Sequence, residues 1–324
     1  MAAAAATAAT VAFVVIVGFQ FGGQSFVIAV DDFGEAVAAL VAAAACAWTA
    51  SRSEGRFRRG WALMAASAAV WGIGEIVWSV YEVVLGVATP FPSAADIGFL
   101  LAVPLAIAGV LFFWTPPRGT AQNWRLWLDA LTICLALTFT GWSLGLQQVE
   151  LSPGNFTERA ILLAYPIGDI LIATFLILAI RRATRYQSAR MLLLLGGLAA
   201  NAIADSAFAY TTATGTNPNL LIDAGWVVGY LMVGLAALWP WKASDRVADS
   251  SPVDLWQIAL PWAAVATAGA SALFVVLRGQ RTDEFQTALA IAMGCVLAIS
   301  EVVIPGWTNW RDGAQSDPHL DRST

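Results

Sequence analysis

Apolar runs of about 20 residues recur along the whole chain, separated by short segments rich in Gly, Pro, Asn or Arg. About 20 apolar residues in a helix are needed to cross the hydrocarbon core of a bilayer, so helices are the predicted spanning element and barrel strands are excluded. Hydrophobic residues make up 59% of the chain and charged residues only 12%. A soluble domain cannot hide that much apolar surface. The sequence therefore predicts an all-α, polytopic integral membrane helical bundle.

The hydropathy pattern predicts about ten transmembrane helices. Most of the 17 Lys and Arg residues fall in the loops of one side when the N-terminus is placed inside, with clusters at residues 52–59 and 181–190. Because cytoplasmic loops retain an excess of basic residues, both termini are predicted to be cytoplasmic and the chain to lie in the cell membrane. The predicted spans are residues 5–22, 33–50, 60–85, 94–114, 126–146, 160–180, 191–213, 219–240, 257–277 and 285–305.

An internal repeat is predicted when the chain is laid on itself, with spans one to four aligned to spans five to eight. An even number of spans per copy implies a parallel repeat about an axis near the membrane normal. The alternative is that any two Ala- and Leu-rich membrane segments align in part. The repeat aligns Gly34-Glu35 with Gly168-Asp169, Glu75 and Trp78 with Asp205 and Phe208, and Asp96 and Phe99 with Asp223 and Trp226.

The repeat defines the predicted domain boundaries. The two copies of the repeat, with four spans each, precede a polar linker. The last two spans form an appended hairpin, which is followed by a short polar tail. The predicted parts are repeat A at 1–122, repeat B at 123–241, linker and C-terminal hairpin at 242–306, and a disordered cytoplasmic tail at 307–324.

Acidic residues within or at the ends of the spans are the most informative side chains. No Lys or Arg lies deep in any span to pair with them, and a carboxylate at mid-bilayer costs about 2.5 to 3.5 kcal/mol on insertion scales. Protonation, hydrogen bonding, a bound cation or a water-filled cavity would each lower that cost. These acids are Glu35, Glu75, Glu82, Asp96, Asp129, Asp169, Asp205, Asp223 and Glu301.

Glu75, Trp78 and Glu82 are spaced three and four residues apart, which places them on one stripe of a helix, with Trp71 one turn away on the same side. This stripe predicts the wall of an outward-facing cavity. Two other interpretations stay open: protonated carboxyls that only fix helix packing, and a proton or ion path. The predicted ligand or cation site comprises Glu75, Trp78, Glu82, Asp96, Asp169, Asp205, Asp223 and Trp226, and the sequence leaves any metal unidentified.

Asp96 also has a predicted structural role. It follows the turn Pro90–Asp96, in which Ser93 is placed to cap a helix N-terminus and Asp96 to sit at the third helical position, near the positive end of the helix dipole.

The sequence lacks the residues that several common kinds of catalytic and cofactor site require. The only histidine is His319, no lysine lies within a span, and there is no phosphate-binding glycine loop or nucleophile with a histidine partner. The chain is therefore predicted to be no enzyme and to use no cofactor. The net charge of −5 and the scattered bases predict no nucleic-acid partner. The predicted partners are the lipid bilayer, other membrane or cytoplasmic signalling proteins, and further copies of the chain.

Two sets of segments carry a family resemblance: Arg59–Trp61, Trp71–Glu75, Tyr81-Glu82 and Pro90–Asp96, and then Tyr165–Asp169, Ala204–Phe208 and Asp223–Trp226. They resemble the N-terminal membrane region of actinobacterial multidomain signalling proteins with cytoplasmic GGDEF and EAL domains. The resemblance implies a sensor of unidentified ligand. The printed chain carries neither domain, so it is similar to the sensor module alone, either as a stand-alone form or separated from its output domains.

Three functions remain open at this point. The first is a sensory or regulatory membrane module that binds a small ligand or cation in the acidic and aromatic cavity. A second is a proton- or cation-coupled secondary transporter, which would also combine a repeat with carboxylates near the midplane. The third is a non-catalytic membrane scaffold whose Gly and Ala surfaces hold other helices close.

Overall fold

Every regular element in the described part of the chain is a helix, which confirms the all-α prediction. The computed structural model describes residues 2–113, 120–153, 155–180, 185–216, 222–240, 255–279 and 281–300. The helices are α1 (Ala2–Gly18), α2 (Gln24–Ser51), α3 (Gly55–Ser79), the π-helical turn η1 (Val80–Val84), α4 (Ala95–Phe113), α5 (Thr120–Gly141), the π-helical turn η2 (Trp142–Leu146), α6 (Gln147–Glu150), α7 (Phe156–Ile180), α8 (Arg185–Thr214), α9 (Ala224–Leu238), α10 (Leu255–Leu277) and α11 (Glu284–Ala298).

Five helical segments in the described ranges are long and apolar enough to cross a membrane. Large apolar side chains such as Val41, Ile73 and Ile203 are exposed on the helices, as expected where lipid replaces water. Each predicted span overlaps a helix, while the number of crossings, their orientation and the location of the termini stay predictions. The five segments are Gly55–Val84, Ala95–Phe113, Leu126–Glu150, Phe156–Ile180 and Ala189–Thr214.

One helix boundary differs from the prediction in a way that matters for the site. We expected the second span to begin near residue 33, but α2 begins at Gln24, directly after a turn in which Gly22 and Gly23 have positive φ angles of 92° and 87°. Asp31 and Asp32 therefore lie inside a helix. Hydropathy placed them in a loop because it scores charged residues as polar wherever they point, whereas their side chains are buried within the bundle.

The chain divides into two compact units, which cut across the predicted domain boundaries. Unit 1 comprises Met1–Thr115 and Leu144–Ile258, and unit 2 comprises Pro116–Ser143 and Ala259–Thr324. In unit 2, α5 packs against α11. Asp283 caps α11 and accepts a hydrogen bond of 2.7 Å from the indole N–H of Trp142. The grouping of α5 with the C-terminal helices follows from packing, and the sequence repeat itself stays a prediction.

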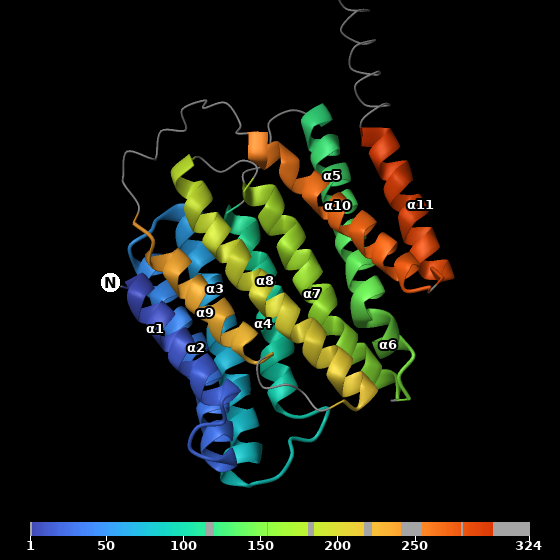
Figure 1. Cartoon of the computed structure of the whole chain (residues 1–324). Coiled ribbons are helices and arrows are strands. Elements are labelled where there is room, and N and C mark those ends of the chain that lie inside the picture. The colour runs from blue at the N-terminus through green and yellow to red at the C-terminus, as the bar shows by residue number, and fades with distance from the viewer. Residues whose placement is uncertain are drawn as a thin grey trace, which may run out of the picture. The chain divides into compact units, whose positions relative to one another are not determined.

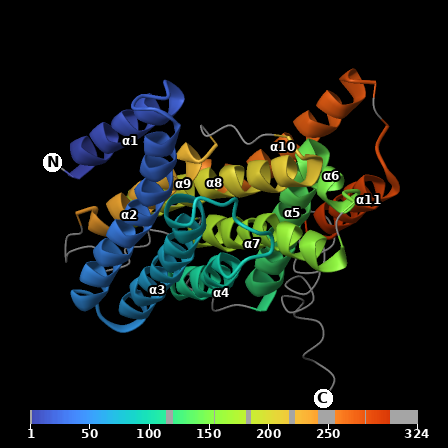
Figure 2. The same ribbon diagram turned by 90° about the horizontal axis from the view of Figure 1, so that it is seen from below.

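Six helices of unit 1 form a closed cycle of neighbours. α2 packs against α3, α3 against α4, α4 against α7, α7 against α8, α8 against α9, and α9 returns to α2. α1 lies against α9 and α2. The helices run alongside one another in Figures 1 and 2. Side chains that face the interior of this cycle meet there although they are far apart in the sequence.

Basic side chains gather at one end of unit 1, where they bond to the ends of helices. The side chain of Arg56 donates to the carbonyl of Phe112 at 2.8 Å, and that of Arg190 donates to the carbonyl of Trp239 at 2.6 Å. Carbonyls at helix C-termini have no partner within their helix and carry the negative end of the helix dipole. The two arginines therefore satisfy and neutralise the C-terminal ends of α4 and α9.

Glycines permit the closest helix contact in unit 1. A Cβ atom at Gly98 in α4 would lie 2.5 Å from the carbonyl oxygen of Val70 and 2.9 Å from the Cα of Gly74, both in α3. Small residues at such crossings let backbones approach, which is the main source of packing between membrane helices.

We expect Gly98→Ala to lower the stability of the detergent-solubilised protein by about 1 to 3 kcal/mol, because the new methyl group must push α3 and α4 apart. Thermal unfolding monitored by circular dichroism measures the effect. Gly234→Ala is the matched control, since its Cβ would lie 3.5 Å from the nearest atom, on Ala42, which is an ordinary contact. An unchanged melting temperature in Gly98→Ala would contradict the close approach.

Candidate functional site

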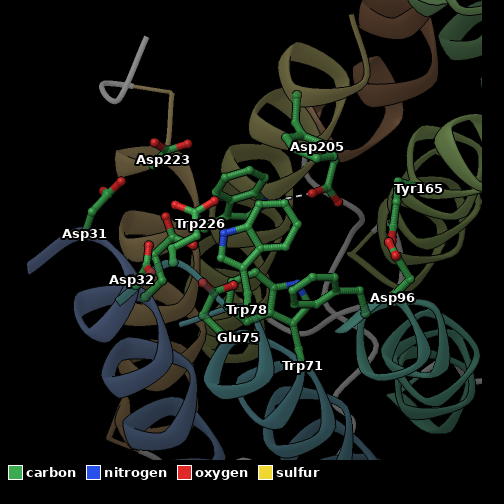
Figure 3. Close-up of a pocket in the computed structure, with 14 residues that line it drawn as sticks. Asp31, Asp32, Trp71, Glu75, Trp78, Asp96, Tyr165, Asp205, Asp223 and Trp226 are labelled. Atoms are coloured by element: carbon green, nitrogen blue, oxygen red, sulfur yellow. Dashed lines mark hydrogen bonds between the residues drawn. The ribbon is translucent and has the colours of Figure 1, made fainter. Parts of the chain in front are cut away.

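A cavity of about 150 Å³ lies inside the helix cycle of unit 1. Its walls come from α2, α3, η1, α4, α7, α8 and α9, so every helix of the cycle contributes a side chain (Figure 3). Eight of its lining residues are acidic and none is basic. The acids are Asp31, Asp32, Glu35, Glu75, Glu82, Asp96, Asp205 and Asp223. The other lining residues are aromatic: Trp71, Trp78, Phe99, Tyr165, Phe208 and Trp226.

Aromatic rings form one wall of the cavity. The ring of Trp71 lies 5.2 Å from that of Phe99, 6.3 Å from that of Trp226 and 4.6 Å from that of Tyr230, measured between centroids. Phe208 lies 6.1 Å from Trp226 and 6.0 Å from Trp78 in edge-to-face geometry. These separations are typical of attractive aromatic pairs. The rings join α3, α4, α8 and α9 into one connected cluster.

Three of the cavity acids accept hydrogen bonds from uncharged donors. Asp96 accepts from the backbone N–H of Ser93 at 2.5 Å and from the hydroxyl of Tyr165. Asp205 accepts from the indole N–H of Trp226 at 2.7 Å, and Glu82 accepts from the hydroxyl of Thr89 at 3.5 Å. Ser93 also accepts from the backbone N–H of Ala95, so the predicted capping role of the Ser93 and Asp96 pair is confirmed.

Five other acids form what we call the acidic pole, and the cavity lining offers them no basic side chain: Asp31, Asp32, Glu35, Glu75 and Asp223. The first four are between 4% and 6% exposed. Oδ1 of Asp31 and Oδ2 of Asp32 are buried without any hydrogen-bond partner. Because a buried charge or unpaired polar group costs several kcal/mol, about 2 to 7 for a neutral group, the acidic pole requires protons or a bound cation.

Asp223 occupies a position at which an aspartate side chain usually caps its own helix. It is the N-cap residue of α9, yet its side chain makes no capping hydrogen bond. An N-cap aspartate typically contributes about 1 kcal/mol by accepting from the first turn. The carboxyl group of Asp223 instead lies within hydrogen-bonding distance of that of Asp31. Two carboxyl groups hold that position only with a shared proton or a cation between them.

The structure brings together most of the site predicted from the sequence. Of the eight predicted residues, all but Asp169 line the cavity. Asp169 lies behind the wall, where its carboxyl group shares a hydrogen bond with that of Asp205. Among the other acids of the spans, Glu35 lines the cavity, Asp129 lies in α5 of unit 2, and Glu301 lies outside the described residues.

Sequence reasoning missed Asp31 and Asp32 altogether. The signal that could have found them is the spacing of Asp31 and Glu35, four residues apart, which places both on one helical face. That signal is visible only if the segment is taken as helical.

No protein-family model matches the chain, and no curated protein or solved structure matches it either. The resemblance to the membrane region of GGDEF and EAL signalling proteins therefore stays a prediction.

We expect Tyr165→Phe to destabilise the protein by about 1 to 3 kcal/mol, because it removes a donor from the buried carboxylate of Asp96. Denaturant or thermal unfolding in detergent measures the change. Tyr210→Phe is the matched control, since Tyr210 is 39% exposed. Equal stability of the two variants would show that the Tyr165 hydroxyl contributes nothing to holding Asp96.

Proposed function

We propose that the chain is a membrane-embedded sensory or regulatory module that binds a small cation in the cavity of unit 1. One observation carries the proposal: five acids from α2, α3 and the start of α9 converge on one cavity whose lining has no basic residue, and Oδ1 of Asp31 and Oδ2 of Asp32 are buried there without a hydrogen-bond partner. At a separation of 4 Å, two like charges repel by about 4 kcal/mol at an effective dielectric constant of 20. A cation in the acidic pole replaces that repulsion with attraction.

The predicted repeat supports a site at this position. The pairs that it aligns, Glu75 and Trp78 with Asp205 and Phe208, and Asp96 and Phe99 with Asp223 and Trp226, all line the cavity. The two copies differ in their partners: Asp205 is bonded to Trp226, whereas Glu75 has no donor among the described residues. The cavity therefore has a side whose acid is hydrogen-bonded, at Asp205, and an acidic pole.

Binding of the ligand would affect the rest of the protein by changing how the helices of the cycle pack. The acidic pole joins α2 and α3 to the start of α9, and the aromatic cluster continues from α3 to α8 and α9. A ligand changes an equilibrium between two helix arrangements only by its difference in affinity for them. A cation that draws α2 and α9 together favours the arrangement in which their carboxylates are closest.

We expect wild-type protein in detergent to be stabilised by at least one cation from a panel of Na⁺, K⁺, Mg²⁺, Ca²⁺ and tetramethylammonium, at constant ionic strength. A ligand at 100 times its dissociation constant contributes about 2.7 kcal/mol. The double variant Asp32→Asn, Glu75→Gln should lose most of this gain. The gain should also fall as the pH is lowered, because protons compete for the carboxylates. Melting temperature is the readout.

The control for this experiment is Glu158→Gln. Glu158 is an acid near the start of α7, outside the cavity, whose carboxylate bonds to Asn155. This variant should respond to cations as the wild type does. If no cation stabilises the wild type, or if the double variant gains as much as the wild type, the carboxyls serve packing alone and the scaffold becomes the better function.

A secondary transporter is the second candidate, and the Asp169 and Asp205 pair favours it. Two hydrogen-bonded carboxyls hold a proton between them, and buried carboxyl pairs of this kind occur in proton relays. The pair touches the cavity through Asp205.

For a transporter, we expect proton or sodium flux in proteoliposomes that depends on a substrate, and Asp169→Asn should abolish it, because the variant removes the carboxyl that shares the proton. A pH-sensitive dye inside the vesicles measures flux. Asp129→Asn, in α5 of unit 2, is the comparison acid. Flux that survives in Asp169→Asn would remove this pair as the coupling site.

A further inference from the structure

We propose that Asp31, Glu35 and Asp223 form a binding site for a hard divalent metal ion such as Ca²⁺. The inference rests on the proposed function, because it names the cation and the three side chains that hold it. The two acids of α2 lie four residues apart on one helical face, and Asp223 comes from the N-terminal end of α9. Figure 3 shows Asp31 facing Asp223 across this gap.

The number of carboxylate ligands favours Ca²⁺. One carboxylate oxygen of each of the three residues lies within 4.8 Å of the other two, so all three can contact one ion. Ca²⁺ takes about six to eight oxygen ligands in flexible geometry. Mg²⁺ demands near-ideal octahedral geometry, keeps several waters and is usually bound by only about one or two carboxylates. Three protein carboxylates at one point therefore favour Ca²⁺ over Mg²⁺.

Ligand chemistry selects the kind of metal. The three ligands are all carboxylates, which suit hard ions such as Ca²⁺, whereas zinc sites in proteins are built mainly from cysteine and histidine. Once deprotonated, the three carboxylates would also carry more negative charge than a monovalent cation can balance. Asp32 and Glu75 line the same cavity and add negative charge nearby.

Two further observations point to a ligand at these residues. Asp31 is 6% exposed, lines the cavity, and leaves Oδ1 without any hydrogen-bond partner. Asp223, whose backbone is helical at φ −64° and ψ −28°, directs its carboxyl group to that of Asp31 and not to the first turn of α9. The unpartnered Oδ1 of Asp31 is unfavourable for packing alone. A metal ion between the two side chains would receive their oxygens.

The test uses the full chain in detergent after treatment with a chelator. Ca²⁺ is added alone, and the melting temperature is recorded against its concentration. Tb³⁺, a Ca²⁺ analogue, is added in a second series, in which excitation of Trp71, Trp78 and Trp226 sensitises its luminescence if it binds near the cavity. Mg²⁺ and Na⁺ at matched ionic strength serve as competing ions.

We expect Ca²⁺ to raise the wild-type melting temperature saturably, with Mg²⁺ weaker and Na⁺ without effect at matched ionic strength. Asp31→Asn and Glu35→Gln should need at least about tenfold more Ca²⁺ for half the shift, because loss of even an outer-shell partner costs about 10- to 100-fold in metal affinity. In chelator alone both variants should be at least as stable as the wild type, since each removes a repulsive charge. Glu158→Gln should match the wild type throughout.

The negative outcomes of this experiment distinguish failure of the metal site from failure of the proposed function. If Ca²⁺ and Tb³⁺ act equally on the wild type, Asp31→Asn and Glu35→Gln, the metal site is wrong. If neither metal binds but tetramethylammonium stabilises the wild type and not the Asp32→Asn, Glu75→Gln variant, the metal site is wrong and the proposed cation-binding function stands. If no cation stabilises the wild type, both proposals fail.

Discussion

Burial of carboxyl groups without a basic partner is the constraint on which the rest of this structure depends. Most helices of the cycle in unit 1 bring an acidic or aromatic side chain to one cavity. In an apolar bundle such groups are stable only where a donor, a proton or a cation meets them. The helix that carries Asp31, Asp32 and Glu35 can continue through polar residues because the interior of the bundle accepts them.

Charges of opposite sign are separated along the helices of unit 1. Arginines bond to the C-terminal carbonyls of α4 and α9, while acids lie toward the N-terminal ends of the same helices, at Asp96 and Asp223. Each sign thus meets the favourable end of the helix dipole. Asp96 uses this position to cap its helix, whereas Asp223 does not. The same residue type therefore caps its own helix at one helix start and faces the carboxyl group of Asp31 at the other.

Hydrogen-bond partners divide the cavity acids more clearly than burial does. Asp96 and Glu75 are about equally buried, at 5% and 4% exposure, yet only Asp96 has donors. The proposed cation site is therefore confined to the acidic pole, because Asp96, Asp205 and Glu82 already have donors. Asp169 supports the transporter, because its bond to Asp205 places a proton beside the cavity wall.

The sequence by itself determined the helices and much of the site. Hydropathy located a helix at each predicted span, and the three- and four-residue spacing placed Glu75, Trp78 and Glu82 on one face, because the helical period fixes which side chains point together. Only the tertiary structure decided three matters: that Asp31 and Asp32 belong to a helix, that α5 groups with α11, and that Asp169 lies behind Asp205. These depend on which helices are neighbours, and contacts between distant segments leave no periodic signal in the sequence.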